Sequence, residues 1–172
     1  MSRVPANPTN QNEPQTQKLV ILLLLACLGL ILLFCAAMII DFNRVAPVRS
    51  FTITDEHTVQ WQLDPVKYGA HHVTISGWAL VELEPLTEFE TAVILQDTAT
   101  GESIQLPTTV VKRVELNEKY PDGTDYSQCG FLAKANSTFI HLDTTSYKVL
   151  LKYFNNGYQV YIDTGQVIGG GK

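Results

Sequence analysis

Residues 19–40, LVILLLLACLGLILLFCAAMII, form the longest apolar run in the chain and contain no charged residue, amide or proline. An α-helix rises about 1.5 Å per residue, so this run spans roughly 33 Å, enough to cross a hydrocarbon core of about 30 Å. The run is apolar on all sides, whereas a core helix of a soluble protein usually keeps a polar stripe. The pattern predicts one transmembrane helix over residues 19–40.

From residue 51 onward the apolar positions follow a period of two, which is typical of β-strands. Turn signals divide the alternating runs, and Asn156-Gly157 between two of them is a strong hairpin signal. About ten short strands and no soluble helix predict an antiparallel β-sandwich, immunoglobulin-like or jelly-roll-like, with about 8–10 strands. The predicted strands cover residues 51–54, 58–63, 72–81, 89–95, 103–106, 109–116, 130–135, 138–142, 148–154 and 158–163.

The segments outside these elements are polar or rich in glycine. Residues 1–18 are rich in Pro, Asn and Gln, a composition that predicts a disordered cytoplasmic tail. Residues 41–50 contain Pro47 and are expected to form a juxtamembrane linker. The sandwich domain is therefore expected over residues 51–168, and the glycines of residues 169–172 indicate a flexible C-terminus.

The apolar run is longer than the core of a cleaved secretory signal, which has about 7–15 apolar residues followed by a small-residue cleavage site. Ala36-Ala37 is followed by further apolar residues instead. The run is therefore interpreted as an uncleaved signal anchor of a single-pass protein of the cell membrane.

The positive charges beside the run do not decide its orientation. Arg3 and Lys18 precede it, and Arg44 and Arg49 follow it, so the count is equal on the two sides. A short tail inside and a large domain outside is the commoner arrangement for such a chain. We expect a cytoplasmic N-terminus and an extracytoplasmic C-terminal domain.

The charge of the domain argues against nucleic acid as a partner. Arg3, Lys18 and Glu13 precede residue 41, which leaves 10 of the 12 basic and 16 of the 17 acidic residues and a formal charge of −6. Nucleic-acid binding requires clustered cations that release counterions from phosphate. A domain of about 130 residues can also bury a core without disulfides or metal.

The cysteines predict no disulfide within the domain. Cys27 and Cys35 lie in the apolar run, and Cys129 is the one cysteine after it. Cys129 is interpreted as a small buried apolar residue, with an intermolecular bridge or a reactive thiol as the alternative.

Four residues of the apolar run form a candidate packing face for another membrane helix. Ala26, Gly29, Leu33 and Ala36 are spaced three, four and three residues apart, so they share one side of a helix. Small residues allow close approach of helix backbones in lipid, where packing drives association. The expected partner is an integral membrane protein; the alternative is that Ala and Gly are simply common in membrane helices.

The sequence offers no pattern typical of an enzyme or a metal site. Its histidines are His57, His71, His72 and His141, and adjacent residues of a strand point to opposite faces. No metal-ligand spacing and no nucleophile motif is present. We expect no catalytic residues, no metal and no cofactor.

Acidic residues and tryptophans each have two interpretations. Glu82 with Glu84, and Glu88 with Glu90, are expected to share strand faces. Such carboxylate pairs either hold Ca²⁺ or flank a glycosidic bond, or they form a solvated edge that discourages strand pairing. The solvated edge is the preferred interpretation. The segment Asp122-Gly-Thr-Asp125 has the composition of a turn, which is its preferred interpretation, and a cation site is the alternative.

Trp61 and Trp78 both lie within apolar strands. They are expected to belong to the core of the sandwich. The second interpretation is a platform on which a glycan stacks.

Four segments resemble a small β-sandwich module of bacterial envelope proteins associated with polysaccharide-synthesis machinery. They are Val73-Thr-Ile-Ser-Gly-Trp-Ala79, Lys112-Arg-Val-Glu-Leu116, Cys129-Gly-Phe131 and residues 147–153. The module has an Arg-x-Asp-Val strand, which appears here as Arg113-Val-Glu-Leu116. The resemblance implies an accessory ectodomain of an envelope complex, without catalytic residues.

The leading hypothesis is a non-enzymatic, single-pass accessory subunit of a cell-envelope complex, whose ectodomain contacts protein partners. The alternative is a membrane-anchored glycan-binding module, for which envelope glycan would be the partner.

Overall fold

The computed structural model describes residues 13–42, 45–48, 51–53, 58–136 and 139–170. The chain divides into two compact units, Met1–Phe42 and Asn43–Lys172. Residues 1–12 of the tail predicted for residues 1–18, and residues 171–172 of the predicted C-terminal end, lie outside the described residues.

The first unit contains one helix, α1 (Glu13–Phe42), which is longer at both ends than the predicted residues 19–40. Within it, Gln17–Ile40 has a mean hydropathy of 3.2 and is long and apolar enough to cross a membrane. No part of this span is buried inside the protein. The prediction of a single long apolar helix near the N-terminus is confirmed.

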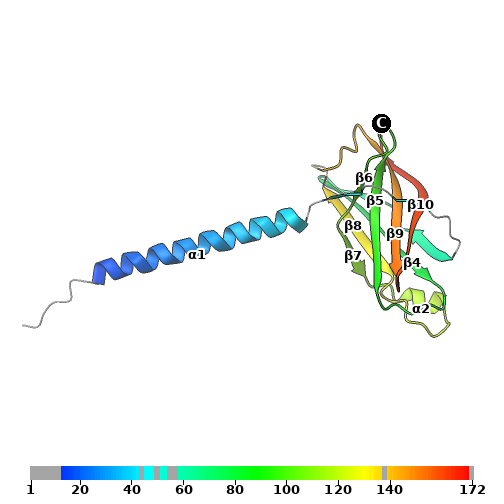
Figure 1. The fold of residues 1–172 in the computed structure, drawn as a ribbon, viewed down its shortest axis with the longest axis horizontal. Coiled ribbons are helices and arrows are strands. Elements are labelled where there is room, and N and C mark those ends of the chain that lie inside the picture. Colours follow the sequence, from blue (N-terminus) through cyan, green and yellow to red (C-terminus); the bar gives the residue numbers. More distant parts are fainter. Residues whose placement is uncertain (1–12, 43–44, 49–50, 54–57, 137–138, 171–172) are drawn as a thin grey trace, which may run out of the picture. The chain divides into compact units, whose positions relative to one another are not determined.

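The second unit is an antiparallel β-sandwich, which confirms the predicted fold class (Figure 1). Sheet A has the strand order β1-β6-β5-β9-β10, and sheet B has the order β2-β4-β8-β7, with β3 also paired to β4. The strands of sheet A are β1 (Ala46–Val48), β6 (Ser103–Gln105), β5 (Phe89–Asp97), β9 (Ser146–Asn155) and β10 (Tyr158–Gly169). The strands of sheet B are β2 (Val59–Leu63), β3 (Lys67–Tyr68), β4 (His72–Val81), β8 (Gly130–Asn136) and β7 (Thr108–Val111).

Several boundaries differ from those that the alternation predicts. The expected linker 41–50 contains β1, which pairs with β6, so part of this stretch belongs to sheet A. Phe51–Ile53 form no strand, and neither do residues 139–142, while 54 and 138 lie outside the described residues. Strand β10 extends to Gly169, so the first residue of the expected flexible end 169–172 belongs to sheet A.

The predicted strand 109–116 ends at Val111, and a short helix, α2 (Glu115–Lys119), follows. Glu115 and Glu118 in its first turn and Lys119 in its last turn complement the helix dipole. The Arg-x-Asp-Val strand that the resemblance implies is therefore absent at residues 113–116, where the chain turns into α2.

Alternation of side chains across the strands builds the main core between the two sheets. Odd-numbered residues of β4, β5, β8 and β9 point inward, for example Ile75, Val93, Phe131 and Leu151, and each is at most 1% exposed. Burial of one such side chain stabilises the fold by about 1.5–3 kcal/mol. We call this cluster the inter-sheet core; its buried members are Val59, Val73, Ile75, Ala79, Val93, Leu95, Leu106, Phe131, Ala133, Ala135, Ile140, Tyr147, Val149, Leu151, Tyr153, Val160, Ile162 and Ile168.

A second cluster lies on the opposite face of sheet B. Even-numbered Trp78 and Leu80 of β4 point away from the inter-sheet core. Leu116 of α2, with Tyr126 and Cys129 of the loop that follows, buries them. We call these five residues the outer cluster, and we call α2 with residues 120–129 the cap.

The backbone explains the residue types at the turn 156–157 and at position 77. Asn156-Gly157 connects β9 and β10, and both residues have positive φ angles of 50° and 83°, which confirms the predicted hairpin turn. At Gly77 of β4, a Cβ atom would overlap the carbonyl oxygen of Gln62 in β2. Glycine at position 77 therefore permits the close approach of β2 beside Trp78.

Candidate interaction surfaces

The predicted packing face of α1 is exposed along its whole length. Ala26, Gly29, Leu33 and Ala36 are all exposed, and Leu33 has 70% of its surface accessible. A Cβ atom at Gly29 would meet nothing within 4 Å. The four residues of the face are therefore uncovered on α1 itself.

Trp78 lies in the outer cluster with 6% of its surface exposed. Its ring contacts Tyr120 edge to face at 6.0 Å, and the Nζ atom of Lys119 lies 4.3 Å from its centroid. These two side chains of the cap cover the Trp78 ring. The burial of Trp78 therefore favours the core interpretation and leaves little of the ring accessible to a sugar.

Trp61 is half-buried on β2, an edge strand of sheet B. Its pairing with Ala79 places it on the inner face, where it packs against the inter-sheet core. Trp61 and Trp78 therefore face opposite sides of sheet B and do not form one joint platform.

The four glutamates are arranged differently from the prediction. Strand β4 ends at Val81, and Leu83 has a φ angle of 63°, so Glu82 and Glu84 lie in a turn rather than on one strand face. Glu90 pairs with Lys152 of β9 at 3.0 Å across the outer face of sheet A. Glu88 is exposed immediately before β5.

The carboxylates of the turn 122–125 are occupied by hydrogen bonds within the cap. Asp122 accepts from the Tyr126 hydroxyl at 2.6 Å and from the Thr124 amide at 2.8 Å. Asp125 accepts from Asn117 Nδ2 at 2.8 Å and from the Ser127 amide at 2.9 Å. This turn therefore has a structural role in the cap.

Hydrogen bonds explain the acidity of these groups. The Asn117 side chain and then the Ser127 amide lower the pKa of Asp125 to about 2. The Tyr126 hydroxyl is the first cause of the lowered pKa of Asp122. Both carboxylates are therefore ionised at neutral pH.

The described histidines and Cys129 were the other candidates for chemistry in the domain. His72 and His141 line one depression with Asp143, but the described residues contain no group of three or more potential metal ligands. His57 lies outside the described residues. Burial raises the pKa of the Cys129 thiol to about 12, so this thiol is neutral and poorly nucleophilic.

An ion pair that sequence analysis did not identify ties β2, β4 and the start of the cap together. Arg113 contacts Asp64, the residue after β2, and also lies 3.4 Å from Glu115. Asp64 accepts a second hydrogen bond from Ser76 of β4 at 2.8 Å. In the sequence, Arg113 stood out only as part of the resemblance to the Arg-x-Asp-Val strand. Its acidic partner, Asp64, lies 49 residues away, so no local pattern joins the two.

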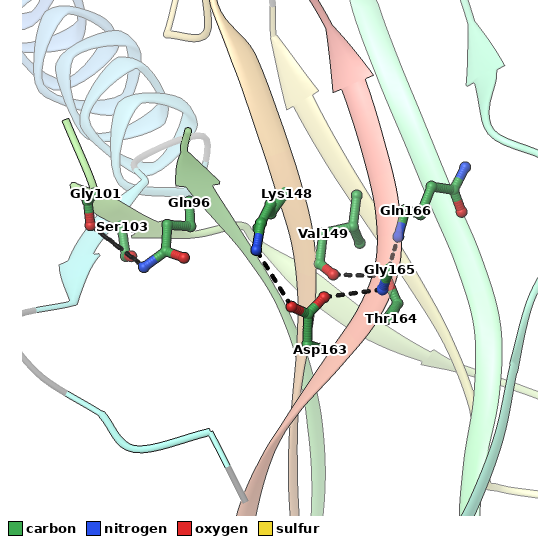
Figure 2. A network of polar contacts seen from close by, with 9 residues as sticks. All are labelled: Gln96, Gly101, Ser103, Lys148, Val149, Asp163, Thr164, Gly165 and Gln166. Atoms are coloured by element: carbon green, nitrogen blue, oxygen red, sulfur yellow. Dashed lines mark hydrogen bonds and ion pairs between the residues drawn. The ribbon is translucent and has the colours of Figure 1, made fainter. Parts of the chain in front are cut away.

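Strand β10, the long edge strand of sheet A, is irregular, and Figure 2 shows the polar contacts at this place. Its register against β9 shifts between Asp163 and Val167. Asp163 accepts from the Gly165 amide at 2.8 Å and pairs with Lys148 at 3.5 Å, while the Thr164 hydroxyl donates to the Val149 carbonyl at 2.6 Å. A bulge of this kind twists an edge and hinders pairing with another strand.

A groove of about 580 Å³ lies beside the start of β5 and the strand β7. We call it the side groove. Its described lining is mostly apolar, and Asp125 is the one charged side chain in it. The lining residues are Pro85, Leu86, Thr87, Phe89, Val110, Thr124, Asp125 and Gln128.

Polar atoms lie at the end of the inter-sheet core behind this groove. Thr91 Oγ1 is buried and has no hydrogen-bond partner among the described residues. Phe89 packs edge to face on Tyr153 at 5.8 Å, and Asn155 Nδ2 donates to the Pro85 carbonyl at 3.4 Å. Buried polar atoms at this end of the core therefore lack some of their hydrogen bonds among the described residues.

Comparisons with known proteins give no relative: no protein-family model, no characterised protein and no solved structure matches the chain.

Proposed function

We propose that this chain is a non-enzymatic, single-pass accessory subunit of a cell-envelope complex. Its helix packs against an integral membrane partner, and its sandwich contacts a protein partner outside the membrane. The observation that carries this proposal is the combination of an apolar span with none of its surface buried and a compact sandwich that buries its own core.

The helix supports the proposal because the residues of the packing face are exposed on α1. A span that served only as a tether would need hydrophobicity alone, and Leu would satisfy that need at every position. Gly29 between Ala26 and Ala36 instead gives a path of small side chains, which favours close helix contact.

The sandwich supports an interaction role because its candidate reactive side chains make structural contacts instead. Asp122 and Asp125 hold the cap, Arg113 holds Asp64, and the Cys129 thiol is buried. The side groove is a described surface where apolar side chains remain accessible beside an open strand edge.

The alternative, a membrane-anchored glycan-binding module, has weaker support. Sugar stacking needs an accessible aromatic face, but Trp78 is buried beneath the cap and Trp61 packs against the inter-sheet core. The proposal of a protein-binding subunit therefore takes precedence.

The proposed topology places the N-terminus in the cytoplasm. A cysteine introduced at the exposed Glu102 should react in intact cells with a thiol reagent that does not cross membranes. The natural cysteines give little background, because Cys129 is buried and Cys27 and Cys35 lie in the apolar span. Labelling that occurs only after lysis would reverse the orientation.

The subunit role is tested by Gly29→Ile in the full chain. This change places a branched side chain in the middle of the packing face and keeps the span apolar, so membrane insertion should be retained. Loss of close contact should weaken association by about 1–2 kcal/mol. The measurement is quantitative co-purification of membrane proteins in mild detergent, compared with the unchanged chain.

Cys35→Ile is the matched control, because it also adds a branched side chain. Cys35 follows Ala26 by nine residues, about two and a half helical turns, and so lies on the other side of α1. Co-purification should be unaffected by this change. If Gly29→Ile retains its partners as well as Cys35→Ile does, the helix is only a tether.

A further inference from the structure

The two halves of β5 have different surroundings. On one side, β9 pairs with the strand over its whole length, from Phe89 to Asp97. On the other side, β6 pairs only with Ile94–Gln96. Among the described residues, no strand pairs with this second side of Phe89–Ala92.

The gap arises because the chain leaves sheet A after β6. Leu106 donates its amide to the Val93 carbonyl at 2.8 Å, which is the last backbone bond of that ladder. Pro107 cannot donate a ladder hydrogen bond, and the chain then continues as β7 of sheet B. The Thr108 hydroxyl accepts a hydrogen bond from the Val93 amide at 3.2 Å, which closes the end of the gap nearest to β6.

The backbone beside the gap is oriented for pairing. In an antiparallel ladder, residues alternate in the side to which their N–H and C=O groups point. The groups of Val93 point toward β6, so those of Thr91 and Phe89 point toward the gap. The gap thus presents the donors and acceptors of a strand edge, without the bulge that disrupts β10.

The floor of the gap is apolar. Val110 pairs with Phe131 of the inter-sheet core, and directly opposite residues share a face, so Val110 points between the sheets. It is nevertheless 52% exposed. Val110 and Phe89 line the side groove together, as inward-facing residues that lack a covering strand.

Two acidic side chains lie beside the gap, and Lys112 lies near one of them, Asp125. The Asp125 carboxylate lines the groove and is ionised at neutral pH, and Glu88 is exposed beside Phe89. An acidic rim repels acidic strands and attracts cationic ones, which gives selectivity to an otherwise open edge.

We propose that the side groove binds an extended segment of a partner protein, which pairs with Phe89–Ala92 as an added strand of sheet A. Its alternate apolar side chains cover Phe89 and Val110, and a Lys or Arg meets the acidic rim at Asp125. Strand addition of this kind takes affinity from backbone hydrogen bonds and specificity from the side-chain pockets. This inference rests on the proposed function, since it names the chemistry of the extracytoplasmic contact.

The test uses the full chain in lipid nanodiscs and a phage-displayed library of random peptides about six residues long, a typical strand length. Enriched peptides should alternate apolar residues and carry Lys or Arg. Val110→Asp places a carboxylate on the groove floor and should weaken their binding by at least about tenfold. Bound peptide should also slow hydrogen exchange at the amides of Phe89 and Thr91.

Val167→Asp is the matched control, because Val167 is also 52% exposed but lies on the bulged strand β10. It should leave peptide binding unchanged. Absence of enrichment, equal binding to the Val110→Asp variant, or unprotected amides at Phe89 and Thr91 would each overturn the proposal.

Self-association of the chain that Val110→Asp abolishes would also overturn it, and would identify a second copy as the occupant. These outcomes are separate from those of the Gly29→Ile experiment. If the groove fails to bind peptides while Gly29→Ile still loses partners, the proposed subunit function stands without this contact.

Discussion

The inter-sheet core and the outer cluster both bury large side chains, but different kinds of structure enclose them. Strands on both sides enclose the inter-sheet core, and backbone hydrogen bonds to neighbouring strands hold them. The outer cluster has a strand only on the side of β4. A five-residue helix and a loop cover its other side.

Side-chain hydrogen bonds, rather than a ladder of backbone hydrogen bonds, hold this loop. Asn117 accepts from the Tyr126 amide at 2.7 Å and donates to Asp125. The Tyr126 hydroxyl accepts from the Leu83 amide at 2.7 Å, which joins the cap to the turn after β4. Segments with few ladder bonds open locally at lower free energy than core strands. We therefore expect the cap to open without unfolding of the sandwich.

The largest expected effect comes from the inter-sheet core. Phe131→Ala removes a ring that is 1% exposed and leaves a cavity between the sheets, which should lower the free energy of unfolding by about 3–5 kcal/mol. Because both sheets contact this cavity, the whole sandwich should be destabilised. Urea unfolding of the full chain in detergent, with hydrogen exchange, measures both the size and the extent of the effect.

Leu116→Ala is the matched change in the outer cluster, since Leu116 is also 1% exposed. The cap can relax into the space, so the loss should lie near the lower end of the range for such changes, about 2 kcal/mol. Exchange should accelerate in residues 115–129 and stay at the parent rate in β5 and β9. Equal acceleration in the strands by both variants would show that the two clusters unfold as one.

The difference between the clusters also explains what the sequence could predict. The inter-sheet core follows a period of two, so the β-sandwich and most of its strands were predictable from residues such as Val73 and Leu151. The outer cluster has no such period. Leu116 is the single buried residue of α2, and one apolar position cannot distinguish the end of a strand from a short helix.

The same limit, that only local patterns can be read from a sequence, applies to the candidate interaction surfaces. The packing face that we propose on α1 rests on the spacing of Gly29 and its neighbours, which is a local pattern. The contact of Arg113 with Asp64 joins residues 49 positions apart, and the side groove depends on where the chain leaves sheet A at Pro107. Both depend on strand order, which no local pattern contains.

The smallest expected effect is a dependence of the cap on pH. The pKa of Asp125 is lowered from 3.8 to about 2, first by the Asn117 side chain. A folded-state pKa below the unfolded value means that the ionised group stabilises the fold above about pH 4 and that this contribution disappears as the pH falls toward about 2. Acid should therefore loosen the cap before it unfolds the strands.

Asp125→Asn removes this titration and should flatten the profile of cap stability between about pH 4 and about pH 2, although Asp122, whose pKa is also lowered, retains part of the slope. The fluorescence of Trp78 reports the cap, because its ring lies against Tyr120 and Lys119, and Trp61→Phe removes the other tryptophan. Glu118→Gln is the control, an exposed carboxylate of α2 that accepts no hydrogen bond among the described residues. If Glu118→Gln flattens the profile as much as Asp125→Asn does, general charge repulsion, and not the hydrogen bonds of Asn117 and Ser127, governs the acid response of the cap.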